Sequence, residues 1–200
     1  MSNGPQDDFS VPYEKVPVTA RPVTETPITL GATSGTSETP GGGTRRLFAT
    51  RADFHAGSAE VIALAKRELR IFDTDLSELG FNSPEMEERI GNFLHGSRTN
   101  RLLIAVRETE YIVQSCPRLI RLLREYSHAI FIHQINDAIR NLEDIMVIAD
   151  DAHYLRRPNF GQPKGVVVLN DANETHGWLN RFEEIWEQST PAVSATTVGL

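Results

Sequence analysis

The chain has 200 residues, of which 40% are apolar and 24% charged, and its formal net charge is -7 with a pI near 5.4. This length and composition suffice for one globular domain with tails. The acidic balance argues against a nonspecific nucleic-acid binder, which normally presents a basic face to phosphates. No apolar run approaches the roughly 20 residues that span a bilayer, so we expect no membrane segment.

Cysteine usage and the first residues indicate a compartment. Cys116 is the only cysteine, so the chain cannot form an intramolecular disulfide. The opening MSNGPQDDFS is polar and lacks the apolar core of a secretory signal. Both features are typical of the reducing cytosol, and we expect a cytoplasmic protein of bacterial type.

Residues 1–46 are rich in Pro, Thr, Gly and Ser and contain few large apolar side chains. Such a segment cannot bury enough surface to offset its ordering entropy, so we predict a disordered arm with a hinge at Gly41–Gly43. Its Val/Pro/Thr repeats are also consistent with docking on a protein partner as an extended strand. Residues 189–200 are predicted to form a flexible tail, which leaves residues 47–188 as the folded domain.

The first half of the domain alternates between helical and extended patterns. An apolar stripe predicts a helix over residues 51–68, and RIFDTD at 70–75 is expected to form a strand. Ser-Pro-Glu at 83–85 combines a cap, a first-turn proline and an acidic residue that favours the helix dipole, so it predicts a helix that ends near Gly96.

Two further strands and a helix follow. RLLIAVR at residues 101–107 is the kind of apolar run found in a central strand that is covered on both faces. Pro117 begins a helix that is expected to end near residue 127, and AIFIHQI at 129–135 predicts a third strand. This order indicates parallel strands joined by helical crossovers.

The last part of the domain has a different pattern. DIMVIADDAHYLRRP at residues 144–158 predicts two strands joined by a turn at Asp150, and GVVVLND at 165–171 predicts another strand. A closing helix is expected over residues 173–188. The predicted fold class is therefore α/β, with a mixed, mostly parallel sheet flanked by helices.

This order of elements resembles one half of a phospholipase D-like protein. The pieces that carry the resemblance are AKRELRIFDTDLS near the start of the domain, IMVIADDAHYLRRPN at the hairpin and WLNRFEEIW at the end. The likeness covers almost all of residues 47–188. Active members of the superfamily pair two such halves across one cleft, so the resemblance implies that a homodimer is one expectation.

The superfamily's catalytic signature is His-x-Lys followed by an aspartate, then Gly-Ser and an asparagine. When Asp150 is aligned with the signature's aspartate, Glu143 stands at the histidine position and Ile145 at the lysine position. Arg157 and Pro158 fall on the Gly-Ser pair, and Asn159 lies next to the asparagine position. Only the aspartate matches.

The missing residues are those that perform the chemistry. Glutamate cannot replace the imidazole nucleophile, and isoleucine supplies no cation for the phosphate oxygens. No other His-x-Lys occurs in the chain. The resemblance therefore implies a non-catalytic phospholipase D-like domain that acts as a binding or interaction module, and no cofactor is expected.

Candidate ligand-binding residues lie near predicted strand ends, where α/β sheets bind ligands. Arg107 ends a central strand, His133 lies near the end of the third strand, and Arg140 follows in the next loop. Glu143 and Asp150 flank the first strand of the hairpin. The two arginines are compatible with an anion pocket, although packing at the rim of the core is the commoner role of a histidine such as His133. Most other arginines are expected to pair with glutamates on helix faces.

Asp73 and Asp75 support an alternative of another class. An Asp-x-Asp after an apolar strand is how haloacid-dehalogenase-type phosphatases present a nucleophile and an acid/base beside Mg²⁺, and Asp150 would complete the metal site. Thr109 and Lys164 are a poor fit for the further residues that this family needs. The competing interpretation is a surface loop in which Asp75 caps the residues that follow.

Three other residues have two interpretations each. Cys116 precedes a helix, whose N-terminus would lower a thiol pKa, but no cysteine or histidine signature accompanies it. A small buried side chain is the better interpretation. Trp178 and Trp186 recur at helical spacing and are predicted to be core anchors rather than stacking platforms.

Overall fold

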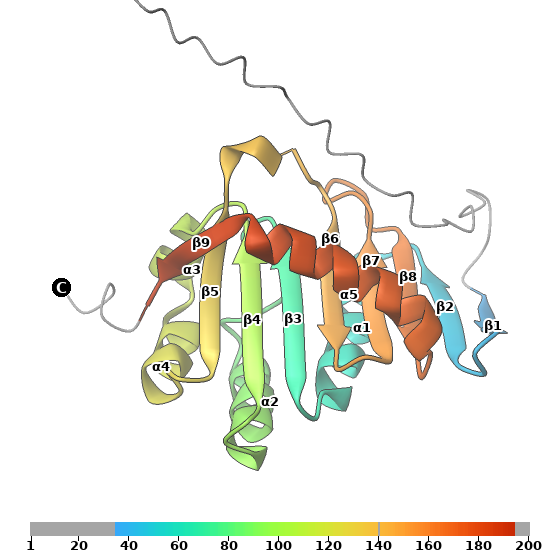
Figure 1. Cartoon of the computed structure of the whole chain (residues 1–200), viewed down its shortest axis with the longest axis horizontal. Helices are drawn as coiled ribbons and strands as arrows, with labels where there is room; N and C mark the ends of the chain where they lie inside the picture. The colour runs from blue at the N-terminus through green and yellow to red at the C-terminus, as the bar shows by residue number, and fades with distance from the viewer. Residues whose placement is uncertain (1–34, 140, 195–200) are drawn as a thin grey trace, which may run out of the picture.

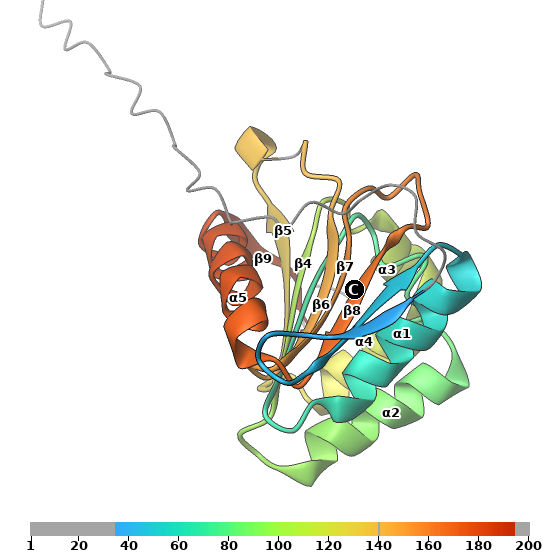
Figure 2. The same cartoon turned by 90° about the vertical axis from the view of Figure 1, so that its right-hand side faces the viewer.

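The computed structural model describes residues 35–139 and 141–194, which form a nine-stranded sheet with helices on both faces (Figures 1 and 2). The strands are β1 Thr36–Glu38, β2 Thr44–Phe48, β3 Glu68–Asp73, β4 Arg101–Val106, β5 Ile130–Ile135, β6 Ile145–Ala149, β7 His153–Arg157, β8 Gly165–Leu169 and β9 Ser189–Val193. The helices are α1 Arg51–Leu64, α2 Pro84–Gly96, α3 Glu110–Ser115, α4 Pro117–Glu125 and α5 Ala172–Glu187, and a 3-10 turn, η1, spans Asp137–Ile139.

The sheet order is β1-β2-β8-β7-β6-β3-β4-β5-β9. Strands β3, β4 and β5 run parallel, and the remaining pairings are antiparallel. The prediction of a mixed α/β sheet flanked by helices is confirmed. The sheet is not mostly parallel as expected, because β6 joins β3 antiparallel and because β1, β2 and β9 come from segments whose composition predicted no strands.

Helix starts follow local capping chemistry. Each of three polar residues that precede a helix accepts a hydrogen bond from the backbone amide three positions later, at 2.9–3.1 Å: Thr50, Ser83 and Asp171. Such bonds satisfy amides that the helix itself leaves free. The helix start at Ser-Pro-Glu is confirmed, with Pro84 in the first turn.

The core consists of two apolar layers, one on each face of the sheet. Helices α1, α2 and α4 cover one face, and α5 crosses the other (Figure 2). Strands β4 and β6 contribute buried side chains to both layers, because successive residues of a strand point to opposite faces. This explains their nearly continuous apolar sequences.

The segment before α1 corrects the prediction of an arm over residues 1–46. Strands β1 and β2 form a hairpin, and β2 pairs with β8 at the edge of the sheet. Gly42, in the predicted hinge, instead makes the hairpin turn with a φ of +79°. Edge strands bury little side-chain surface, so their formation depends on pairing with the backbone of another strand. The amino-acid composition of the segment does not reveal that partner. Residues 1–34, with the proposed partner-docking repeats, lie outside the described residues.

The other predicted tail, residues 189–200, also begins with a strand. β9 pairs antiparallel with β5, and Val193 is buried. Residues 195–200 lie outside the described part of the chain. None of the helices within the described ranges is both long and apolar enough to cross a bilayer.

Candidate functional site

The parallel strands β3, β4 and β5 end at the same edge of the sheet, the upper edge in Figure 1. We call this region the carboxyl edge, made of residues 73–83, 107–109, 136–139, 141–144 and 157–162. It holds the position that the phospholipase D-like alignment assigns to the catalytic histidine. The connection that contains η1 rises above it (Figure 1).

Arg157 is a fully buried side chain of the carboxyl edge, with only 1% of its surface exposed. Its Nε donates to the carbonyl oxygen of Gln162 at 2.7 Å, and its terminal nitrogens donate to the carbonyl of Phe160 and the carboxylate of Glu78. The guanidinium also lies over the rings of Phe54 and Phe160, 5.0 and 5.6 Å from their centroids. A large cation therefore occupies the position aligned with Gly-Ser.

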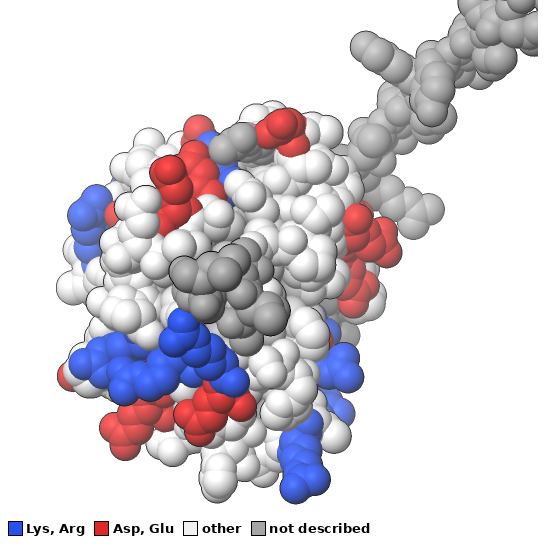
Figure 3. Space-filling model, turned by 90° about the vertical axis from the view of Figure 1, so that its left-hand side faces the viewer, with Lys and Arg blue, Asp and Glu red and all other residues white. Residues whose placement is uncertain are grey.

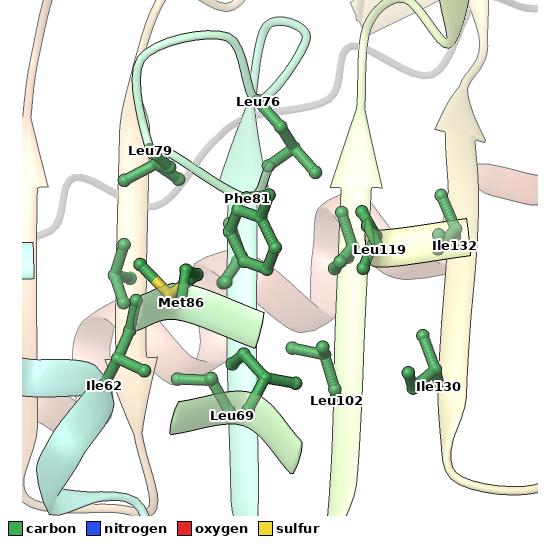
Figure 4. Close-up of a cluster of buried hydrophobic side chains, with 14 of the residues drawn as sticks. Ile62, Leu69, Leu76, Leu79, Phe81, Met86, Leu102, Leu119, Ile130 and Ile132 are labelled. Carbon is green, nitrogen blue, oxygen red and sulfur yellow. The ribbon is translucent and has the colours of Figure 1, made fainter. Parts of the chain in front are cut away.

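Glu78 reaches Arg157 from the loop between β3 and α2, residues 74–83. Leu76, Leu79 and Phe81 of this loop are buried, and Figure 4 shows them pointing into the core. Leu76 has a φ of +68°, a conformation that non-glycine residues seldom adopt. The buried anchors hold the loop in place and leave the Glu78 side chain at the carboxyl edge.

Glu143 lies at the rim of the carboxyl edge and is exposed. Its carboxylate accepts a hydrogen bond from Nδ2 of Asn159 at 2.7 Å, and its carbonyl accepts one from the amide of Phe160 at 3.1 Å. Ile145, at the lysine position of the alignment, is fully buried in the apolar core. Glu143 and Ile145, at the two aligned positions, thus provide neither an imidazole nor a cation.

Asp73 ends β3 and is fully buried. Its Oδ1 accepts the amide of Thr74, while Oδ2 has no hydrogen-bond partner among the described residues. Burial raises the pKa of Asp73 to about 7, and the negative charges of Asp75 and Glu78 act in the same direction. Asp73 therefore exchanges a proton near neutral pH.

Arg107 follows β4 and is fixed through its backbone. Its amide donates to the carbonyls of Asp73 and Thr74, and its carbonyl accepts from Nε2 of Gln134 at 3.0 Å. The Nε atom of Arg107 and the hydroxyl of Thr74 are buried and have no hydrogen-bond partner in the described part of the chain. Two adjacent strands thus place polar atoms with unused hydrogen-bonding capacity at the carboxyl edge.

His133, another predicted site residue, is engaged in packing. Its ring stacks on Trp186 with 3.8 Å between centroids, and its Nδ1 lies 3.0 Å from the hydroxyl of Ser189. Burial lowers its pKa, which keeps the imidazole neutral. These contacts fit the interpretation of His133 as a packing residue. Arg140 lies outside the described residues.

Asp150 lies at the opposite edge of the sheet. Its carboxylate accepts the amides of Lys66, Arg67 and Glu68 at 3.0, 2.8 and 3.0 Å, in the turn that leads into β3. Glu143 precedes β6 and Asp150 follows it. The two residues are seven positions apart in a largely extended chain, which separates them by roughly 20 Å. The structure therefore does not bring these two predicted site residues together, and Asp150 closes a turn.

The same placement corrects the metal-dependent phosphatase alternative. Asp73 and Asp75 lie at the carboxyl edge, whereas Asp150 is at the other edge because β6 runs antiparallel to β3. Among the described residues, no three His, Cys, Asp or Glu side chains are arranged to hold a metal ion. Asp75 instead accepts the amide of Ser77 at 2.9 Å, as the loop interpretation predicts. The alternative is not supported.

Cys116 and the two tryptophans have structural roles. Cys116 is buried, burial raises its pKa to about 11, and its side chain makes no capping bond. Trp178 and Trp186 pack against the core layer beneath α5, and the guanidinium of Arg156 lies 4.2 Å from the Trp178 ring centroid. The predictions of a small buried residue and of two core anchors are confirmed.

Charged side chains on the helices are mostly mixed in sign. Figure 3 shows the side of the molecule on which α4 lies, where Lys and Arg form a band with Asp and Glu next to it. Arg118 and Arg121 of α4 both contact Glu87 of α2. This matches the expectation of helix-face arginines paired with glutamates.

Sequence reasoning missed Glu78 and Arg51, which together with Arg157 form a charged group at the carboxyl edge. Glu78 and Arg157 are 79 positions apart. No local pattern links a loop glutamate to a cation so distant in the chain, and only their approach in space reveals the group.

Comparisons with known proteins are consistent with the fold described above. A family model described as a domain of unknown function (DUF7931) matches residues 50–196. No curated protein matches the chain.

Solved structures are similar over most of the described residues. One is TrmBL2, an archaeal chromatin protein with a novel mode of DNA binding, at 12% identity and a TM-score of 0.56, covering 78% of this chain and 56% of that one. Another is Nuc, a phospholipase D family member from Salmonella typhimurium, at 12% identity and a TM-score of 0.54, covering 76% and 99%. NucT from Helicobacter pylori has 13% identity and a TM-score of 0.52, covering 74% and 98%. At these identities the likeness shows the fold alone, and the phospholipase D-like fold is confirmed.

Proposed function

Because the chain belongs to the DUF7931 family of domains of unknown function and has a phospholipase D-like fold, we propose that it is a non-catalytic module that binds an anionic group at the carboxyl edge. The proposal has two parts. The first concerns the missing chemistry, and the second concerns the binding atoms.

The absence of phosphodiesterase chemistry is supported by the residues at the aligned positions. Glu143 carries no imidazole and is hydrogen-bonded to Asn159, so it offers no nucleophile of the required kind. Ile145 is buried and supplies no cation to stabilise phosphate oxygens. Arg157 and Pro158 stand at the aligned Gly-Ser positions, and Arg157 donates its hydrogen bonds to acceptors within the protein.

The observation that carries the binding role is the buried Nε of Arg107, which has no hydrogen-bond partner among the described residues, as is also true of the Thr74 hydroxyl. Leaving a buried polar group without a partner costs about 1–3 kcal/mol, so such groups are rare unless a ligand or water satisfies them. Both lie where strands of an α/β sheet end, the usual place for a ligand.

The chemistry of these atoms favours an oxyanion. Guanidinium and hydroxyl groups donate hydrogen bonds to phosphate or carboxylate oxygens, and Gln134 holds the backbone from which Arg107 extends.

Isothermal titration with inorganic phosphate tests the site. We expect wild-type protein to bind phosphate and Arg107→Met to bind about tenfold or more weakly, because a hydrogen bond to a charged group is worth roughly 1.5–3 kcal/mol. Arg181→Met is the matched control, since Arg181 pairs with Glu184 on the surface of α5. Equal affinities of Arg107→Met and wild type would refute the proposal.

Duplex DNA is a second probe in the same titration. The expectation against nucleic acid rests on the net charge of -7, whereas TrmBL2, of similar fold, is a DNA-binding protein. We expect phosphate binding without comparable DNA binding at physiological salt. Tight, salt-dependent DNA binding that Arg107→Met abolishes would identify the anion as a nucleic-acid backbone.

A further inference from the structure

A second cationic group at the carboxyl edge involves none of the atoms of the Arg107 site. Arg157 is 1% exposed, Glu78 15% and Arg51 72%, and the Glu78 carboxylate lies between the two guanidinium groups. One carboxylate oxygen accepts from Arg157, and the other lies 3.2 Å from a terminal nitrogen of Arg51. Arg51 stands at the first position of α1.

Arg157 requires an anion at this place. A guanidinium stays protonated at any pH that proteins tolerate, and a buried charge without a counter-charge is strongly destabilising. Among the described residues, Glu78 is the only carboxylate that contacts Arg157. Glu78 therefore acts as an internal counter-ion for Arg157, which stays protonated.

The geometry keeps Arg157 in position whether or not Glu78 is present. Two of its three nitrogens are tied to the carbonyls of Gln162 and Phe160, and its planar face rests on Phe54 and Phe160. The third nitrogen then points at whatever anion occupies the place of the Glu78 carboxylate. Such preorganisation lowers the entropy cost of binding an anion.

Glu78, in contrast, contacts the two guanidinium groups through its side-chain carboxylate. Its neighbours Leu76 and Leu79 anchor the loop, so the carboxylate can rotate away without unfolding the backbone (Figure 4). Burial and the charge of Glu78 both raise the pKa of Asp73, which shows that negative charges crowd this loop. Arg51, largely exposed, gives an incoming anion access from solvent.

We propose that Arg157 and Arg51 form an oxyanion site that the Glu78 carboxylate occupies as a built-in competitor. Its ligand is a phosphate group, free or carried by a small molecule, which replaces the carboxylate when the Glu78 side chain rotates outward. The two terminal nitrogens that hold Glu78 suit the oxygens of phosphate equally well.

Glu78→Gln tests the proposal, because glutamine retains the volume and removes the competing charge. By titration with inorganic phosphate at constant ionic strength, we expect Glu78→Gln to bind at least about tenfold more tightly than wild type, since the loss of the competing anion leaves a buried charge to be neutralised. The gain disappears in Glu78→Gln/Arg157→Met. It persists in Glu78→Gln/Arg107→Met, so failure of this site and failure of the Arg107 site are distinguishable.

Glu87→Gln is the matched control. Glu87 also lies between two arginines, but Arg118 and Arg121 are 34% and 63% exposed, so both remain solvated when the carboxylate is removed. We expect no gain in phosphate affinity from this variant. An equal gain would show that any arginine pair released from its glutamate binds phosphate, and the proposed site would be wrong.

Folding of the variant gives a second readout. Glu78→Gln is expected to have a lower melting temperature than wild type in chloride, and phosphate at equal ionic strength should restore most of the loss. If Glu78→Gln fails to fold in chloride, recovery of folded protein in phosphate is the expected result. A variant that phosphate neither binds nor stabilises overturns the inference.

Discussion

The protonation state of the Asp73 side chain affects the stability of the whole domain. Its folded-state pKa of about 7 lies above the ordinary value of 3.8, so the folded protein binds this proton more tightly than the unfolded chain. The contribution of Asp73 to stability is therefore highest below pH 4, falls as the pH rises from about 4 to 7, and stays low above 7. The difference is at most about 4 kcal/mol, because each pKa unit corresponds to about 1.4 kcal/mol.

We expect Asp73→Asn to flatten this dependence. The amide carries no charge to desolvate, so the advantage of the variant over wild type should be largest at pH 8, smaller at pH 5 and absent below pH 4. Urea denaturation at pH 5, 6, 7 and 8 measures the effect. Asp151→Asn, at an exposed position of the β6–β7 turn, should retain the wild-type slope. A wild-type slope in Asp73→Asn would show that another group causes the pH dependence.

Asp150, the one residue that matches the superfamily signature, is expected to act on stability rather than on binding. Asp150→Ala leaves three backbone amides without their acceptor and should cost about 2 kcal/mol of unfolding free energy. Asp150→Asn should cost less, because asparagine retains an acceptor oxygen and tolerates the φ of +54° at this position. Urea denaturation ranks the three proteins. Reduced phosphate affinity in folded Asp150→Ala would contradict the structural role.

Among the elements, the β1–β2 hairpin depends on close backbone approach to the β8–α5 connection. A Cβ added at Gly43 would lie 2.4 Å from the carbonyl oxygen of Leu169, whereas one at Gly42 would meet nothing within 4 Å. Gly42 instead requires a positive φ, whose cost for alanine is about 1 kcal/mol.

We therefore expect Gly43→Ala to release the hairpin and Gly42→Ala only to weaken it. Hydrogen exchange at the amides of β1 and β2 should rise to the rate of an open segment in Gly43→Ala, while β3 and β4 remain protected. Protection of β1 and β2 equal to that of wild type would show that the backbone shifts to accept the new methyl group.

At the scale of the whole molecule, the proposed function implies that the scaffold is retained without its chemistry. The chain is similar to Nuc over nearly all of that protein, yet the aligned positions carry Glu143 and Ile145. We expect no hydrolysis of bis-p-nitrophenyl phosphate above the buffer rate. Turnover by wild type that is lost in Glu143→Gln would establish an enzyme and overturn the binding-module proposal.

Several features could be predicted from the sequence because they depend on neighbouring residues. Apolar periodicity and capping residues located the main helices and six of the strands, since both act within a few positions of the chain. The alignment around the hairpin predicts that the catalytic histidine and lysine are absent, and this stays a prediction. The buried state of Cys116 and the packing of the two tryptophans followed from the same local patterns.

Only the tertiary structure decided where these pieces meet. β2 and β9 form strands because β8 and β5 offer backbone groups with which they can pair. Neither segment is apolar enough to be predicted as a strand from its own sequence. The antiparallel direction of β6 separates Glu143 from Asp150, and Glu78 meets Arg157 across 79 positions of the chain. Residue identity and local pattern predicted which catalytic residues the chain lacks, whereas strand direction and long-range approach determined which charged side chains lie together.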